Sequence, residues 1–314
     1  MTNDLFPLVH DLSDIVGHQK IISASIGPHG EACLLLTAPE NEAIAYGRKE
    51  QKGFASFPLS IARKYFPATF IRYDGNLLQQ TPIAAVQQAF PSVQPLTNQE
   101  ILIIGARCDF RNGKPEKNAT VFDGAGNALR QFVLGDGIQD VQTTKDGMIW
   151  VSYFDEGIFG NYGWSEPIGA PGLVCFDATG RKLWEFKAPE GFDAMADCYA
   201  MNVADDSVWA CYYTDFPVVN IDAQRNVRAW ANEFAGATAM AVDERRVVLW
   251  GGYGEEGSRC VSQNFGDRKL EKAKKVPLRF PAGVEAKNVR LIGRGSALHL
   301  FDGCRWYVWK LQEL

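Results

Sequence analysis

The chain has 314 residues and a formal net charge of −5, with 46% hydrophobic and 22% charged residues. This composition excludes an intrinsically disordered chain. The negative balance argues against nucleic acid as the main partner, because neutralising phosphates requires a basic surface.

The N-terminal stretch and the cysteines bear on cellular location. The segment MTNDLFPLVHDLSDIVG carries acids where a secretion signal carries Lys or Arg. No stretch approaches the roughly 18 consecutive apolar residues of a membrane span. The seven cysteines include no CxxC pair, and most fall within apolar strand-like runs, as buried reduced thiols do. We therefore expect a cytoplasmic protein with no membrane contact.

A pattern of four short strands recurs about every 40–60 residues, a period typical of stacked repeat units. Its clearest copy spans residues 140–186. There a strand (DVQTT), a turn (KDG), an aromatic strand (MIWVSYF) and a long loop are followed by a strand (GLVCFD), a turn (ATG) and a strand (KLWEF). Such a unit cannot bury its own faces and must stack on its neighbours.

Six such units follow one another along the chain. The expected inner strands are 21–27, 92–97, 140–144, 199–204, 238–243 and 288–293. The expected second strands are 32–38, 100–107, 148–154, 207–213, 246–253 and 297–301. The sixth unit runs out of chain after a third strand at 305–311, so residues near Leu5–Leu12 would supply its outer strand and remove an exposed sheet edge.

We therefore predict an all-β fold, a six-bladed β-propeller of four-stranded antiparallel blades, closed by pairing of the N-terminal segment with the last blade. The whole chain, 1–314, is expected to form this single domain. The blades are expected at about 20–84, 92–134, 138–188, 197–234, 238–280, and 286–314 together with 4–14.

The run KDG-x-IW-V-S…G-L-V-x-FD-x-x-G resembles the blade signature of NHL, SMP-30 and sensor-type propellers. The match is clear in one blade and partial in three. The resemblance implies the propeller architecture. It carries over no functional residues, because propellers host unrelated activities.

Loops of unequal length mark one end of the predicted blades, and long loops on one rim are where specificity tends to lie. Residues 39–67 and 155–171 are long, and 108–118 is intermediate. The loop DEGIFGNYGWSEPIGA (155–170) places Phe159, Tyr162 and Trp164 among glycines and acids. Aromatic side chains in this setting are typical recognition anchors. The alternative is that they fold back and cover the channel as a local plug.

Acidic residues are expected at the same rim. Asp136, Asp140, Asp193 and Asp197 precede or begin inner strands, whereas Asp155, Glu156, Glu166, Asp215, Glu255 and Glu256 follow the ends of second strands. Like charges around one opening would attract a cationic partner or a metal ion. The alternative is that the channel-mouth acids Asp140 and Asp197 cap strand amides and tie blades together, while the others are solvated.

The sequence contains no HExxH, GxSxG or GxxxxGK[ST] motif. This favours a binding protein over an enzyme, with no catalytic residue, metal or cofactor. We expect a basic protein partner, bound through Asp155, Glu156, Phe159, Tyr162, Trp164, Glu166, Asp215, Glu255 and Glu256. One such binding protein would be an inhibitor, for example a bacterial immunity protein that neutralises a cationic toxin such as a nuclease.

Two alternatives remain open. SMP-30-like lactonases hold a divalent metal with Glu, Asn and Asp side chains, and Glu31, Asn202 and Asp197 suggest such a set. Glu31 nevertheless falls at the wrong end of its strand for a site at the channel mouth, and Asn202 lies in the middle of its strand. Both positions argue against a lactonase site. A propeller that binds a carbohydrate or another small ligand is the second alternative, with Trp164 stacking on the ligand. Lectin propellers usually repeat their site in each blade, whereas the aromatic loop occurs once.

Overall fold

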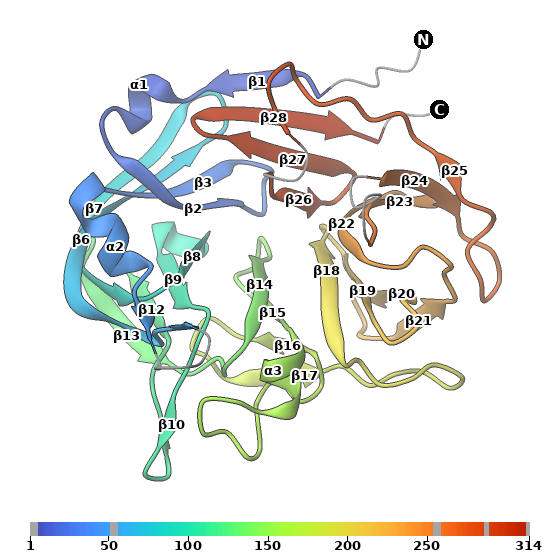
Figure 1. Cartoon of the computed structure of the whole chain (residues 1–314), viewed down its shortest axis with the longest axis horizontal. Helices are drawn as coiled ribbons and strands as arrows, with labels where there is room; N and C mark the ends of the chain where they lie inside the picture. The colour runs from blue at the N-terminus through green and yellow to red at the C-terminus, as the bar shows by residue number, and fades with distance from the viewer. Residues whose placement is uncertain (1–5, 51–55, 254–258, 286–288, 312–314) are drawn as a thin grey trace. The chain divides into compact units, whose positions relative to one another are not determined.

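The computed structural model describes residues 6–50, 56–253, 259–285 and 289–311. These residues contain six four-stranded antiparallel sheets, the blades of an all-β, six-bladed β-propeller (Figure 1). The predicted fold class is therefore confirmed. By its contacts the chain divides into two compact units, Val16–Phe186 and Met1–Ile15 with Lys187–Leu314. Each unit contains three of the six blades and is described by itself below.

The unit Val16–Phe186 contains the first three blades. The first blade consists of β2 (Lys20–Ile26), β3 (Ala32–Thr37), β6 (Ile61–Tyr73) and β7 (Leu77–Gln88). The second consists of β8 (Pro91–Pro95), β9 (Ile101–Gly105), β12 (Ala119–Phe122) and β13 (Ala128–Phe132). The third consists of β14 (Ile138–Thr143), β15 (Ile149–Tyr153), β16 (Leu173–Phe176) and β17 (Lys182–Glu185).

Short elements occupy the connections of this unit. They are η1 (Pro39–Asn41), α2 (Glu42–Ala45), the pair β4 (Arg48–Lys49) and β5 (Phe57–Pro58), η2 (Thr97–Gln99), the pair β10 (Phe110–Arg111) and β11 (Lys114–Pro115), and α3 (Asp155–Phe159). The β10–β11 hairpin projects away from the blades of its unit (Figure 1). The segments expected to be long loops thus carry local structure.

The other unit contains the last three blades. The fourth consists of β18 (Asp197–Val203), β19 (Ser207–Tyr213), β20 (Val218–Asp222) and β21 (Val227–Trp230). The fifth consists of β22 (Ala237–Val242), β23 (Arg246–Gly251), β24 (Arg259–Asn264) and β25 (Lys274–Lys275). The sixth consists of β26 (Leu291–Arg294), β27 (Ala297–Asp302), β28 (Arg305–Lys310) and β1 (Leu8–Asp11), and α1 (Ser13–Val16) follows β1.

The N-terminal segment completes the sixth blade, as the sequence predicted. Strand β1 pairs antiparallel with β28, with His10 opposite Trp306 and Asp11 opposite Arg305. The Leu12 amide extends the pairing by donating to the carbonyl of Cys304, 2.8 Å away. This pairing satisfies backbone groups that β28 would otherwise leave open along an edge.

The core of each unit lies between adjacent blades. Strand β9 (ILIIG) is buried at every position, because a blade covered on both faces needs apolar side chains on both. Phe66, Phe70, Ile101 and Ile103 pack together between the first two blades. A buried side chain of this size stabilises the fold by about 1.5–3 kcal/mol relative to an exposed one.

Two blades depart from the regular pattern of four short strands. In the first blade the third strand, β6, begins at Ile61 and forms a long hairpin with β7. In the fifth blade the paired part of the fourth strand is β25, Lys274–Lys275. The surrounding segment is rich in Lys and Glu, which have low strand propensity, so few of its residues join the sheet.

Four inner strands carry a β-bulge close to their first residues. The register shifts between Ile21 and Ser23, Ile138 and Asp140, Cys198 and Ala200, and Ala237 and Ala239. A bulge leaves one residue unpaired and redirects its side chain. In the fourth blade the bulged residue is Tyr199, which belongs to a surface cluster described below.

Candidate functional site

Three connections of the unit Val16–Phe186 contact one another and form what we call the loop platform. It comprises the described residues of 38–60, 106–118 and 154–171. The Tyr162 hydroxyl donates to the carbonyl of Pro58 at 2.5 Å, and the Phe110 amide donates to the carbonyl of Tyr162 at 2.8 Å. The Trp164 indole donates to the carbonyl of Cys108 at 2.7 Å. Connections from three successive blades are thereby joined.

The sequence 155–170 adopts this arrangement because glycine permits close backbone contact. Gly163 has a φ of +88°, and a Cβ there would lie 2.2 Å from the carbonyl oxygen of Phe110. The rings of Phe110 and Trp164 pack with their centroids 5.0 Å apart. Trp164 is buried and Tyr162 is partly buried, so these two rings pack within the platform. Phe159, by contrast, is 72% exposed.

A buried ion network holds the base of the platform. The Arg107 guanidinium donates to both carboxylate oxygens of Asp136, at 3.0 and 2.8 Å, and to Glu156 at 2.5 Å. It also lies over the Tyr162 ring, 4.0 Å from the centroid. Burial raises the pKa of Asp136, while Arg107 and the Cys108 amide act to lower it. Arg107 was not among the residues singled out from the sequence.

The expected acids of the platform differ in exposure. Asp155 and Glu166 are exposed, and Glu156 is partly exposed despite its contact with Arg107. Asp155 accepts a hydrogen bond from the Glu156 amide at 2.7 Å, in the first turn of α3. Asp140 accepts the amide of Val141 within its own strand at 3.0 Å, the amide-capping arrangement that the sequence left open.

The remaining predicted residues belong to the other unit or lie outside the described residues. Asp197 begins β18 and pairs across the sheet with Tyr213. Asp215 is exposed in the β19–β20 connection. Glu255 and Glu256 lie outside the described residues.

The residues considered for a lactonase metal site have structural partners. Glu31 is fully buried and accepts hydrogen bonds from Arg72 and from the His29 amide, each at 2.7 Å. Asn202, also fully buried, bonds the backbone of Met240 and Gly295 through both ends of its amide. Within the described residues no group of three or more His, Cys, Asp or Glu side chains is arranged to hold a metal ion.

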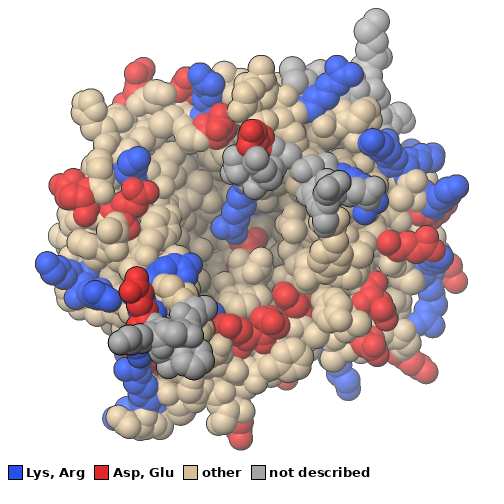
Figure 2. All heavy atoms as spheres, viewed as in Figure 1, with Lys and Arg blue, Asp and Glu red and all other residues tan. Residues whose placement is uncertain are grey.

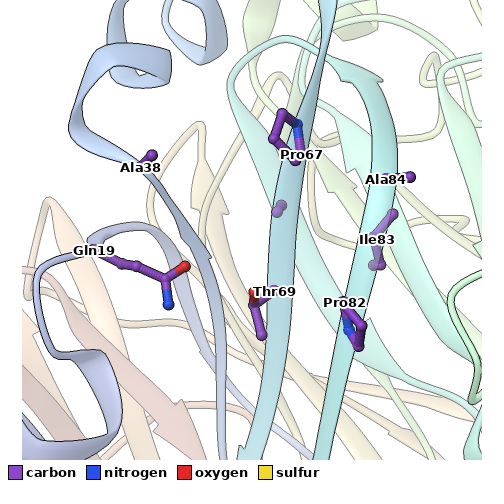
Figure 3. A pocket seen from close by; sticks show the side chains of 8 residues that line it. Gln19, Ala38, Pro67, Thr69, Pro82, Ile83 and Ala84 are labelled. Carbon is purple, nitrogen blue, oxygen red and sulfur yellow. The ribbon is translucent and has the colours of Figure 1, made fainter.

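The surface seen in Figure 2 carries both signs of charge, with Lys and Arg interspersed among Asp and Glu. A separate groove of about 400 Å³ lies against β6 and β7, where it is lined by Pro67, Thr69, Pro82 and Ala84, with Gln19 and Ala38 beside them (Figure 3). Its lining residues include no titratable side chain, so the groove offers no acid–base chemistry. No helix in the described part of the chain is long and apolar enough to span a membrane.

The chain has distant similarities to known proteins. A sequence model of the YxzG family matches residues 168–278, less than half of the chain. No curated protein matches the sequence. Among solved structures, virginiamycin B lyase from Staphylococcus aureus is 10% identical, with a TM-score of 0.48 over 98% of this chain and 100% of that one. A gluconolactonase from Xanthomonas campestris is 11% identical, with a TM-score of 0.43 over 98% and 97%.

Proposed function

We propose that the protein is a non-enzymatic binding protein whose loop platform docks a basic protein partner. The observation that carries the proposal is Phe159, which is 72% exposed in a connection where Trp164 is buried and Tyr162 is partly buried. An exposed large apolar side chain at a loop tip has a solubility cost, which burial against a partner would remove. Aromatic anchors of this kind dominate the energetics of many protein interfaces.

The rigidity of the platform supports this role. Hydrogen bonds from Tyr162 and Trp164 and the ion pair of Arg107 with Glu156 join the three connections. A surface that is already ordered loses less conformational freedom when a partner binds. Phe159 at the end of α3 is therefore presented on a pre-organised support.

The charges around Phe159 favour a cationic partner. Asp155 and Glu166 are exposed in the same connection. The connection 154–171 contains no Lys or Arg, whereas the exposed cations of the platform (Arg48, Lys49, Arg111, Lys114 and Lys117) lie in its other two connections. Exposed acids next to an aromatic anchor would speed encounter with a basic protein and set its orientation.

The proposal is tested by isolating a partner and measuring its affinity for matched variants. We expect Phe159→Ala to weaken binding at least tenfold, the loss typical of an anchor residue. Asp155→Asn with Glu166→Gln should weaken it mainly at low salt, because salt screens exposed charges. Leu129→Ala is the matched control, since Leu129 is 50% exposed on β13 of the same unit. An acidic partner, or affinity unchanged by Phe159→Ala, would refute the proposal.

More specifically, we propose that the partner is a cationic toxin such as a nuclease and that this protein is its immunity protein. The size of the chain, its net negative charge and the lack of catalytic motifs in its sequence motivate the immunity role. Adding the protein to the purified partner should then abolish the partner's catalytic activity at a one-to-one ratio. The Phe159→Ala variant should need a larger excess. A partner that stays fully active when saturated would reject the immunity role and leave the binding role standing.

A further inference from the structure

Four aromatic residues form a surface cluster in the unit that contains the last three blades. They are Tyr199 on β18, Tyr213 at the end of β19, Phe216 in the connection to β20, and Tyr253 after β23. Phe216 lies at the centre, with its ring centroid 5.2–5.7 Å from those of the three tyrosines and with edge-on geometry to each. We call these four residues the tyrosine cluster.

Local backbone features hold the cluster in place. The bulge in β18 leaves Tyr199 unpaired and turns its side chain out of the regular alternation. Phe216 has a φ of +52°, a left-handed conformation that is rare for a bulky residue and often accompanies function. Tyr253 follows Gly252, whose amide donates to the carbonyl of Gly236 at 2.8 Å.

The exposed parts of the cluster combine ring surface with oxygen atoms. Tyr213 is 46% exposed and Tyr253 is 53% exposed. The hydroxyls of Tyr199 and Tyr253 lie 2.8 Å apart. The hydrogen bond with Tyr253, together with burial, raises the pKa of Tyr199. The cluster therefore offers π-faces together with hydrogen-bonding oxygens.

Carboxylates border these rings. Asp197 is directly opposite Tyr213 in the β18–β19 ladder, and side chains of such pairs lie on the same face about 5 Å apart. Asp215 is exposed two residues after Tyr213. An organic cation is attracted to tyrosine faces by the ring quadrupole and to carboxylates by charge. A guanidinium group suits both, because it stacks on aromatic rings and donates to carboxylates in a planar fork.

We propose that the tyrosine cluster is a binding site for an arginine side chain of a basic polypeptide. The proposal rests on the proposed function only for the source of that polypeptide, since the site can be probed with a peptide alone. A neutral sugar would use the same ring faces, but it would gain little from the adjoining carboxylates.

The test compares two peptides titrated into the full-length protein and followed by NMR. One carries three arginines separated by glycines, and the other carries citrulline in their place, a neutral residue of nearly the same shape. We expect the arginine peptide to bind at least tenfold more tightly. Tyr213→Ala and Tyr253→Ala should each weaken it about threefold or more, whereas Tyr253→Phe should retain most of the affinity because it keeps the ring.

Two control variants make the result specific. Tyr65→Ala removes a tyrosine that is 64% exposed on β6 of the other unit, and it should leave peptide affinity unchanged. Phe159→Ala alters the loop platform and should also leave it unchanged, so failure of the platform proposal would be distinguished from failure of this one. Equal binding of the two peptides, absence of binding, or an equal loss in Tyr65→Ala would each overturn the inference.

Discussion

Replacing Arg107 by methionine should strongly destabilise the unit Val16–Phe186. Arg107 is 5% exposed and Asp136 is 1% exposed, and two hydrogen bonds join them. Arg107→Met removes the cation, keeps the apolar volume and leaves Asp136 buried with the Cys108 amide as a remaining donor. Removing one partner of a buried ion pair typically costs about 3–5 kcal/mol. The partly exposed contact with Glu156 should add less than about 1 kcal/mol.

The destabilisation should depend on pH in a defined direction. Burial already raises the pKa of Asp136, and without Arg107 that pKa should rise further. A carboxyl whose pKa is higher in the folded state binds its proton more tightly there than when unfolded. The penalty of Arg107→Met should therefore be small at low pH and should grow as pH rises through the raised pKa of Asp136.

Urea unfolding followed by tryptophan fluorescence measures these effects, since Trp164 belongs to the same platform. The double variant Arg107→Met with Asp136→Asn removes both charges and should be more stable than Arg107→Met alone at pH 7. A loss below about 1 kcal/mol for Arg107→Met, or a double variant less stable than the single one, would contradict the argument that a buried unpaired charge is the cause.

Three further outcomes are expected. Gly163→Ala should lower the free energy of unfolding by about 1–3 kcal/mol in urea titrations, because its Cβ would meet the carbonyl of Phe110 at a positive φ. Burial would raise the pKa of Asp177, but the Thr179 hydroxyl and neighbouring amides lower it to about 2. The stability from Asp177 is therefore present above about pH 4 and lost toward pH 2, and Asp177→Asn should flatten the acid-unfolding curve there. Asn202→Ala removes three buried hydrogen bonds and should lower the free energy of unfolding by about 1–3 kcal/mol, seen as a lower thermal midpoint. The loss should be the same with and without a metal chelator, because it comes from hydrogen bonds.

The fold was predictable because the blade signature has a local physical basis. Third strands of several blades end in an aspartate that closes the following hairpin turn. Asp123 accepts the amides of Ala125 and Asn127, and Asp177 and Asp222 act in the same way. Side chains that bond backbone two to four residues away leave a short sequence pattern, which can be recognised without knowing any long-range contact.

The candidate site was only partly predictable because its decisive contacts span long separations. Loop length and glycine content singled out the segment around Phe159. The pairing of Arg107 with Asp136 joins residues 29 positions apart, and the bond of Tyr162 to Pro58 joins residues 104 apart. No local pattern encodes either contact. The one available signal was an arginine directly after the apolar run ILIIGA, where a buried cation needs a buried partner.

The loop platform and the tyrosine cluster are built in the same way. In the loop platform Trp164 is buried and Tyr162 lies under the guanidinium of Arg107, while Phe159 of the same connection is exposed. In the tyrosine cluster Phe216 is buried, and it supports the exposed rings of Tyr213 and Tyr253. Exposed rings fixed by buried ones lose little entropy on binding. Removing a support such as Trp164 should therefore weaken partner binding through disorder of Phe159, whereas removing Phe159 itself should weaken binding without disturbing the platform.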